Sequence, residues 1–420
     1  MQICVFEDRY YRNFLPLTYL RPIYELRCGA VTLLEKILLS FPKANIILLS
    51  RVDLRDYVSE EYPQHTLKHL NDEDTWFING RVLADDGIKQ LIIKQSKNQK
   101  VYIQGNEIIA AFIHRENVRT VIDQISQTSF DEGMIKDIAS ESCSLRIGRY
   151  PWDLIQQNSI EIENDFQRLL KNRKKKMFSG KLYRGAQIIN KRNVLMGKGT
   201  LIKSGAVLDA ENGPIIIGNN VTIMPNAVIE GPAVIGDNSL IKVGAKIYHG
   251  TTIGPHCKVG GEVEASIIHS YSNKQHDGFL GHSYLGSWVN IGADTNTSDL
   301  KNTYGNVKVY INGELLDTGL QFVGLTMGDH SKTGINVMFD TGSFVGVSCN
   351  VYGAGFPPKF LPSFSWGEKE SWLTYQLEKS IETARRVMAR RNVQMNEHYE
   401  KIFRNVFTAT DAERRNAKIS

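Results

Sequence analysis

The sequence lacks the cysteine content and spacing of a disulfide-bonded or zinc-binding protein. Its five cysteines are scattered along 420 residues, at Cys4, Cys28, Cys143, Cys257 and Cys349, and no two form a CxxC pair. An odd number of widely separated thiols is typical of a reducing compartment. We therefore expect neither a disulfide framework nor a structural zinc site, and we predict a cytoplasmic protein.

Long apolar runs and charge of one sign are also missing. No apolar run approaches the roughly 20 residues that cross a bilayer, and Glu7 and Asp8 interrupt the stretch where a signal peptide would keep its apolar core. The 50 Lys and Arg residues nearly balance the 45 Asp and Glu residues, which leaves a net charge of +5. We therefore expect neither a nucleic acid nor a membrane as a partner. With 42% hydrophobic residues, the chain is predicted to form two or three globular domains.

A six-residue repeat is the strongest pattern that is present. An aliphatic residue returns at every sixth position, at Ile217, Ile223, Ile229, Ile235, Ile241, Ile247, Ile253 and Val259. Every third unit begins with Ile-Gly, at Gly218, Gly236 and Gly254, which indicates three short strands in a triangular coil of about 18 residues. The repeat predicts a parallel β-helix with the aliphatic side chains inside and small residues or glycine at the corners. An antiparallel sandwich would instead show period-two alternation.

The same register extends beyond the central repeat, with breaks. It includes Met196, Ile202 and Leu208 before it, and Phe279, Leu285, Ile291, Met327, Thr333, Phe339, Val345 and Val351 after it. The breaks fall at about 209–216, 260–278 and 295–326. We expect these segments to leave the coil as loops, and loops of this kind often build the functional surface of a solenoid.

The flanking segments have other patterns. Short apolar runs of strand type occur at 1–8, 44–50, 75–80 and 101–105, and residues 31–39 have helical spacing, which predicts a small α/β sheet domain. The basic run KNRKKK at 171–176 follows a helical pattern and is interpreted as a solvated linker. Residues 368–405 predict one long amphipathic helix with an apolar stripe formed by Trp372, Leu373, Leu377, Ile381, Ala384 and Val387.

The segment NKQHDGFLGHSYLGSWVNIGADT (273–295) carries a family resemblance. It resembles the bifunctional N-acetylglucosamine-1-phosphate uridyltransferase/glucosamine-1-phosphate acetyltransferases, whose pattern H-x-x-[YF]-[LV]-G-x-x-x-[IL]-G-x-x-[VC]-N-[IL]-G-A-G-T it matches without a gap. The one departure is Asp294, at the second glycine of GAG. LPLTYLRPIYELRCG (15–29), YPWDL (150–154) and GEVEASIIHSYSNKQH (261–276) resemble a variant branch of that family with a shortened first domain.

The resemblance implies an architecture. It implies an α/β nucleotidyltransferase-like domain (1–160), a helical and basic linker (161–184), a left-handed parallel β-helix acyltransferase domain with hexapeptide repeats (185–360), and a C-terminal α-helix and tail (361–420). It also implies a homotrimer with its acetyl-transfer site at a cleft between subunits. The repeat itself does not fix the handedness of the coil or the number of subunits.

The resemblance further implies the residues of the acetyl-transfer site. The catalytic histidine of the family falls on His276, and an imidazole can accept the proton that an attacking amine loses. The other positions are Asn290 and Glu264 for the substrate, Ala293 for acetyl-CoA, and Asn302 and Tyr304 near a shifted asparagine and tyrosine of the family. His282 competes with His276 as the base, although its register places it at a solvent-facing corner. The six histidines between 249 and 330 contain no H-x-x-x-H pair, so a metal at this site is not expected.

The first domain departs from the family at the positions that handle a nucleotide. A nucleotidyltransferase needs a Gly-rich loop for the phosphates and carboxylates that hold Mg²⁺. The loop at 7–14 has no glycine, and Arg81 and about Arg146 stand at the two carboxylate positions. The residues interpreted as a phosphate-binding cluster are Arg12, Arg21, Arg27 and Arg81, with Glu7, Asp8 or Asp153 as possible Mg²⁺ ligands.

These observations predict sugar-nucleotide biosynthesis of the UDP-N-acetylglucosamine type. The β-helix would transfer acetyl from acetyl-CoA to an amino sugar phosphate, and the first domain would join a nucleoside monophosphate to a sugar-1-phosphate. Two alternatives stay open. One is a single-activity acyltransferase with a degenerate first domain, and the other is a trimeric scaffold that binds sugar nucleotide without turnover.

Overall fold

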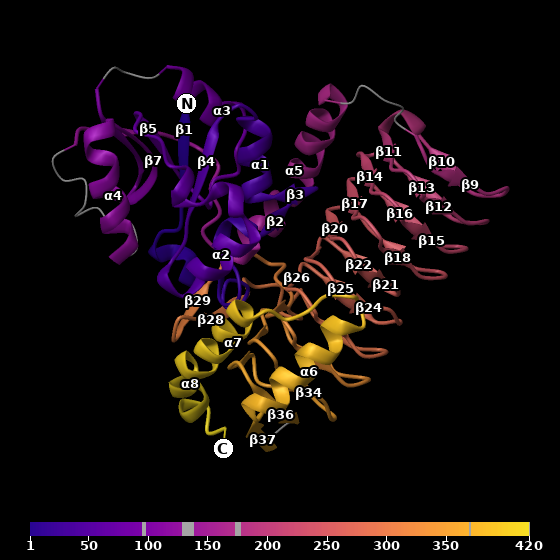
Figure 1. The fold of residues 1–420 in the computed structure, drawn as a ribbon. Helices are drawn as coiled ribbons and strands as arrows, with labels where there is room; N and C mark the ends of the chain where they lie inside the picture. The colour runs from indigo at the N-terminus through magenta and orange to yellow at the C-terminus, as the bar shows by residue number, and fades with distance from the viewer. Residues whose placement is uncertain (95–97, 128–137, 173–177, 369–370, 420) are drawn as a thin grey trace.

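The structure is a computed structural model that describes residues 1–94, 98–127, 138–172, 178–368 and 371–419. Figure 1 shows a sheet domain beside a long column of coils, with a group of helices at the C-terminal end. Most of the predicted basic run at 171–176 lies outside the described residues. Within the described residues, no helix is long and apolar enough to cross a membrane.

The first domain is a six-stranded mixed sheet flanked by helices, as its α/β pattern predicted. Its strand order is β4 (Asn45–Leu49), β1 (Gln2–Phe6), β5 (Thr75–Asn79), β7 (Glu107–Ile113), β6 (Lys100–Gln104) and β8 (Ser140–Ser142). Its helices are α1 (Leu33–Ser40), α2 (Arg55–Glu61), α3 (Asp86–Ile93) and α4 (Arg115–Gln127), and a small hairpin joins β2 (Arg27–Cys28) to β3 (Val31–Thr32). Strand β1 is buried along its whole length because it lies between two parallel neighbours.

Residues 181–368 form a parallel β-solenoid with three faces. The first face contains β10 (Gln187–Ile189), β13 (Val207–Asp209), β16 (Val228–Glu230), β19 (Lys246–Ile247), β22 (Glu262–Glu264) and β25 (Phe279–Gly281), and the pair β27 (Asn296–Thr297) and β32 (Met338–Phe339) follows it. The second face contains β11 (Val194–Met196), β14 (Ile215–Ile217), β17 (Ala233–Ile235), β20 (Thr251–Ile253), β23 (Ile267–Ile268), β26 (Tyr284–Leu285), β30 (Thr326–Met327), β33 (Phe344–Val345) and β35 (Phe360–Leu361).

The third face completes each coil. It contains β9 (Lys181–Leu182), β12 (Leu201–Ile202), β15 (Thr222–Ile223), β18 (Leu240–Ile241), β21 (Lys258–Val259), β24 (Asn273–Lys274), β31 (Lys332–Thr333), β34 (Asn350–Val351) and β36 (Ser365–Glu368). After the solenoid, β37 (Ser371–Thr374) pairs antiparallel with β36. Single bridges at Asn290 link β24 to β31. The aliphatic residues of the central repeat are all buried in one continuous core, which confirms the inward register predicted for them.

The structure corrects one predicted loop. Residues 260–278 do not leave the coil, because they form β22, β23 and β24 on the three faces. The coil shortens here, so that Lys258 pairs with Asn273 and Ile247 with Val263. This shortening shifts the repeat, and Leu280 rather than Phe279 is buried in the core. Residues 298–325 do depart from the coil, and they contain the hairpin of β28 (Lys308–Ile311) and β29 (Glu314–Asp317).

The prediction of one long C-terminal helix is wrong. Trp372 and Leu373 lie in strand β37, and three helices follow: α6 (Leu377–Ala389), α7 (Glu397–Ala409) and α8 (Asp411–Asn416). The chain turns between α6 and α7, where Asn392 has a left-handed φ of 57° and the Asn396 side chain caps α7 by accepting from the Tyr399 N–H. Ile381 and Ala384 of the predicted stripe are buried as expected.

Helix α5 (Pro151–Asn172) joins the two large parts of the molecule (Figure 1). Ile162 and Phe166 of this helix pack in one apolar cluster with Leu195, Ile216 and Val234, which lie on the second face of the solenoid. The buried Asn158 reinforces the contact, since it accepts from the Gly29 N–H and donates to the Gly250 carbonyl. The sheet domain is therefore docked on one face of the solenoid.

Candidate functional site

His276 and Ala293 lie on one corner of the solenoid, where the chain passes from the third face to the first. His276 is at the turn between β24 and β25, and not in a loop that leaves the coil. The next coil follows directly, because the Asp294 N–H donates to the Asp277 carbonyl over 3.0 Å. The His276 side chain is exposed, and among the described residues its ring has no hydrogen-bond partner. The structure thus places the two predicted residues on adjacent coils.

Lys274 supports this corner from inside the solenoid. Its side chain is only 2% exposed, and its Nζ donates to the His276 carbonyl over 2.7 Å. Burial lowers the pKa of Lys274 to about 8, against the opposing effect of the carboxylates of Asp277, Asp294 and Glu262. A buried ammonium group therefore fixes the backbone that presents His276. The sequence pattern did not identify this residue.

Asn290 lies on the third face, next to the His276 corner. It forms a bridge with Asn273 on one side and with Lys332 on the other, so these residues occupy equivalent places on successive coils. The Asn273 Nδ2 lies 3.4 Å from the Asn290 Oδ1, and the Arg391 Nη2 donates to the Asn273 Oδ1 over 2.9 Å. This network orients the Asn290 amide and leaves its Nδ2 without a protein partner among the described residues.

The remaining acceptor candidates gather at another corner, between the first and second faces. The His282 N–H donates to the Glu264 carbonyl over 3.1 Å, and the His282 Nδ1 lies 2.8 Å from the Asp299 Oδ2. The His282 ring also stacks on Phe322 with a centroid distance of 5.0 Å, so this histidine is held rather than free at a solvent-facing corner. Asn302 and Tyr304 are exposed in the insertion that follows Asp299.

The structure does not bring the four predicted arginines into one cluster. Arg81 is buried in the sheet domain, where its Nη2 pairs with Glu107 over 2.8 Å and with Asp8. Arg21 pairs with the buried Asp329 of the solenoid. Arg27 donates to the Ala30 carbonyl over 3.3 Å, and Arg12 is exposed.

The carboxylates of the first domain are engaged by protein groups. Asp8 accepts from Arg81 and Asn79, and Glu7 accepts from Arg51 and from the Ile23 N–H. The same holds for Asp153, which accepts from the N–H groups of Arg149 and Tyr150, and for Asp85 and Glu161, which pair with Arg146. No group of three or more potential metal ligands was found in the described part of the chain. These residues do not fit Mg²⁺, because arginines of the protein or, for Asp153, backbone N–H groups already engage the carboxylates.

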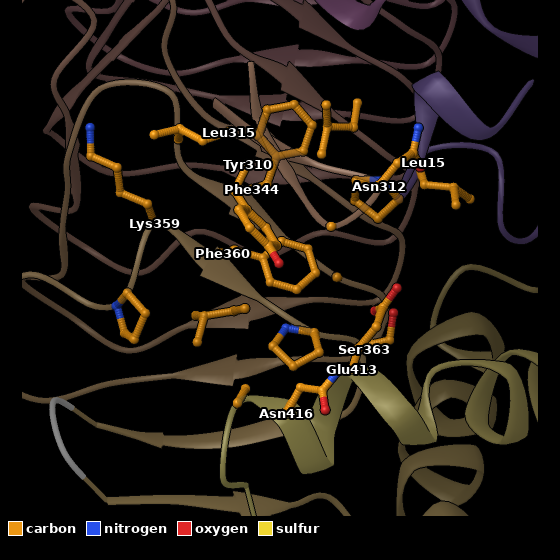
Figure 2. Close-up of a pocket in the computed structure, with 18 of the residues that line it drawn as sticks. Leu15, Tyr310, Asn312, Leu315, Phe344, Lys359, Phe360, Ser363, Glu413 and Asn416 are labelled. Carbon is orange, nitrogen blue, oxygen red and sulfur yellow. The ribbon is translucent and has the colours of Figure 1, made fainter. Parts of the chain in front are cut away.

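A cavity of about 510 Å³ lies away from all these residues. Figure 2 shows that the rings of Tyr310, Phe344 and Phe360 occupy its middle, with Leu15 on one side and Glu413 near the C-terminal helix α8. The lining is mainly apolar, and it contains no histidine and none of the predicted site residues. The cavity therefore offers no histidine as the base for acyl transfer.

The chain therefore has two parts, a mixed α/β sheet and a solenoid that carries the histidine corner. Residues 3–174 match the family model described as sugar nucleotidyl transferase, and residues 214–247 and 232–264 match the bacterial transferase hexapeptide repeat. The chain thus joins a region that is similar to sugar nucleotidyl transferases to a solenoid with hexapeptide repeats.

Known relatives share this combination. The chain is 33% identical over 97 residues to a bifunctional sugar-1-phosphate nucleotidylyltransferase/acetyltransferase from Sulfurisphaera tokodaii, which covers 23% of this chain and 24% of that protein. It is 23% identical over 288 residues to a bifunctional protein GlmU from Ruthia magnifica, over 61% of this chain and 63% of that protein. The matches therefore span less than two thirds of either relative. A solved UDP-N-acetylglucosamine acyltransferase from Campylobacter jejuni aligns with 15% identity and a TM-score of 0.27, over 53% of this chain and 95% of its own.

Proposed function

We propose that the solenoid transfers the acetyl group of acetyl-CoA to the amine of an amino sugar phosphate at the His276 corner. The observation that carries this proposal is the placement of His276 and Ala293 on adjacent coils of one corner, beside the oriented amide of Asn290. The bifunctional relative from Sulfurisphaera tokodaii is an acetyltransferase, which is the same class of reaction.

The chemistry needs one base. The amine nitrogen attacks the thioester carbonyl carbon and forms the new C–N bond, the C–S bond breaks, and coenzyme A leaves as the thiol. His276 accepts the proton that the amine loses and can return it to the departing sulfur. The backbone at Ala293 approaches the acetyl group, and the Asn290 Nδ2 donates to the sugar.

The same corner supports a homotrimer as the working form. Val243 and Ile335 are 60% and 67% exposed, and both lie on the corner that carries His276. In a trimer that meets at this corner, both apolar side chains would be covered by a neighbouring copy. Glu264, Asn302 and Tyr304 lie on a different corner, so in a trimer they would reach the His276 corner of a neighbouring copy.

Nucleotidyl transfer by the first domain is the second candidate function. The family match over residues 3–174 favours it. Against it stand the ion pairs of Arg81 and Arg146 with carboxylates, because the family resemblance places these two arginines where the reaction needs metal ligands. These ion pairs are compatible with a domain that binds a sugar nucleotide but does not catalyse nucleotidyl transfer.

Two product assays on the full chain test both candidates. Thiol release is followed with acetyl-CoA and glucosamine 1-phosphate, and pyrophosphate release with UTP and N-acetylglucosamine 1-phosphate, each with and without Mg²⁺. We expect thiol release in the wild type, its loss in His276→Ala, and its retention in the control His282→Ala. If only His282→Ala loses thiol release, His282 beside Asp299 is the base instead of His276. If the wild type releases no thiol, the trimeric scaffold without turnover is favoured. Pyrophosphate release that depends on Mg²⁺ would establish the second activity.

A further inference from the structure

A cationic groove lies on the third face of the solenoid, closed on one side by the C-terminal helix α6. It has a volume of about 380 Å³. The polar residues that matter for its chemistry are Lys258, Asn273, Asn290 and Lys332 from the coils, and Arg390 and Arg391 from the end of α6. Only Asn290 among these belongs to the predicted site.

The four cations of the groove have no carboxylate to balance them. None of the described residues that line the groove is acidic, and no ion pair was found for any of the four cations within the described ranges. Burial lowers the pKa of Lys332 to about 8, and burial together with Arg391 and Arg390 lowers the pKa of Lys258. Mutual repulsion of these cations is relieved when an anion binds between them.

The coil spacing arranges these groups along a line. Lys258 pairs with Asn273, Asn273 with Asn290, and Asn290 with Lys332, so the four residues occupy one column of successive coils. Neighbouring strands lie about 4.8 Å apart, which puts the backbones of Lys258 and Lys332 about 14 Å apart, with two amides between them. This length suits a phosphorylated sugar.

Helix α6 is tied to this column, and an aromatic wall borders it. Arg391 donates to the Asn273 Oδ1 over 2.9 Å and to the His256 carbonyl over 3.2 Å, which holds its guanidinium at the groove. The stacked rings of Tyr271 and Trp288, 4.2 Å apart, form part of the lining. At the other edge Gln275 lines the groove and is followed directly by His276.

We propose that this groove binds the phosphate or pyrophosphate group of the acyl acceptor, with Arg390 and Arg391, which directly follow α6, as its recognition arginines. The acceptor would then run from the cations, along the Asn290 amide, to the His276 corner. The proposal rests on the proposed acetyl transfer and adds that the C-terminal helix selects a phosphorylated acceptor. Phosphates of coenzyme A share this chemistry, and the test separates the two sources.

Binding to the full chain tests the proposal without turnover. Titration calorimetry is carried out with inorganic phosphate, pyrophosphate, glucosamine 1-phosphate and coenzyme A. The variants are Arg390→Gln and Lys258→Gln, which each remove one unpaired cation. The control is Arg386→Gln in α6, because the Arg386 side chain pairs with Glu382 away from the groove.

We expect each groove variant to weaken binding of glucosamine 1-phosphate by about tenfold, because a charge-assisted hydrogen bond to phosphate is lost. The control variant should bind as the wild type does, and coenzyme A affinity should stay unchanged in all variants. If both groove variants bind every phosphate probe with wild-type affinity, the proposal that the groove binds phosphate is wrong. Weaker binding of coenzyme A with unchanged binding of glucosamine 1-phosphate would overturn the assignment to the acceptor.

Failure of the groove proposal can be distinguished from failure of the proposed acetyl transfer. Phosphate binding that depends on Arg390 in a His276→Ala variant supports the groove even if no acetyl transfer is measured. Thiol release whose KM for glucosamine 1-phosphate is unaffected by Arg390→Gln and Lys258→Gln overturns the groove while the transfer activity stands.

Discussion

At the scale of single residues, Lys274 stands where the preceding coil has Val259, pointing into an apolar core. Such a charge is costly to bury, and its pKa of about 8 expresses that cost. Since the pKa is lower in the folded chain than in the unfolded one, the unfolded state holds more protons between about pH 8 and 10. Stability therefore rises with pH across this window.

We predict that Lys274→Met raises the free energy of unfolding at pH 7 by about 1–3 kcal/mol, because an apolar side chain of similar length replaces a buried charge. The same change should slow acetyl transfer, since the His276 carbonyl loses its donor. Urea unfolding at pH 7 and pH 9.5 measures both the gain and the reduced pH slope. Lys246→Met, which removes an exposed lysine paired with Glu262, is the control. An unchanged slope would contradict the assigned pKa.

The sequence predicted His276, Ala293 and Asn290 because they belong to one contiguous pattern. Whether that pattern is the working site stays a prediction. Lys258, Lys332 and Arg391 could not be predicted as their neighbours, because coil stacking and a distant helix bring them together. The arginines of the first domain looked like a cluster in the sequence, but Arg21 and Arg81 have separate buried partners that no local pattern encodes.

At the scale of elements, the hexapeptide repeat determined the inward residues but not the length of every coil. Pairing between parallel coils tolerates a turn that is shorter by two or three residues, so 260–278 stays in the solenoid although its spacing breaks. The C-terminal helix was mispredicted because helical spacing at 371–374 coincides with a strand that pairs with β36.

We expect Ile241→Ala to lower the free energy of unfolding by about 2–5 kcal/mol, since Ile241 is fully buried in the solenoid core. Leu240→Ala in the same strand β18 is the matched control, because Leu240 points outward and is half-buried. Thermal and urea unfolding of the two variants give the comparison. Equal losses would contradict the assigned register.

At the scale of the whole molecule, one buried pair crosses the contact between the sheet domain and the solenoid. Arg21 and Asp329 are almost fully inaccessible, and burial raises the pKa of Asp329 against the effect of Arg21. We predict that Asp329→Asn costs about 3–5 kcal/mol, because it leaves a buried guanidinium uncompensated. Calorimetry should then resolve separate unfolding of the two parts. The control Asp340→Asn removes an exposed partner of Lys359 and should leave one transition.

Assembly is the second property at this scale. If Val243 and Ile335 form the contact between copies, the double variant Val243→Asp, Ile335→Asp should be a folded monomer without acetyl transfer. Light scattering after size-exclusion chromatography measures the mass, and circular dichroism verifies the fold. A variant that remains a trimer, or a wild type that is a monomer, would contradict this interface.

The helix α5 that docks the sheet domain also limits how this chain can be divided. A chain cut after α5 would leave Leu195, Ile216 and Val234 on a bare solenoid face and Ile162 and Phe166 on a bare helix. A cut before α5 would expose Leu154 and Ile155, which pack with apolar residues of the sheet domain. The newly exposed apolar surface would promote aggregation of the fragments. Gene fusion or fission at this junction is therefore disfavoured, and the contributions of the two halves are best separated by point substitutions in the intact chain.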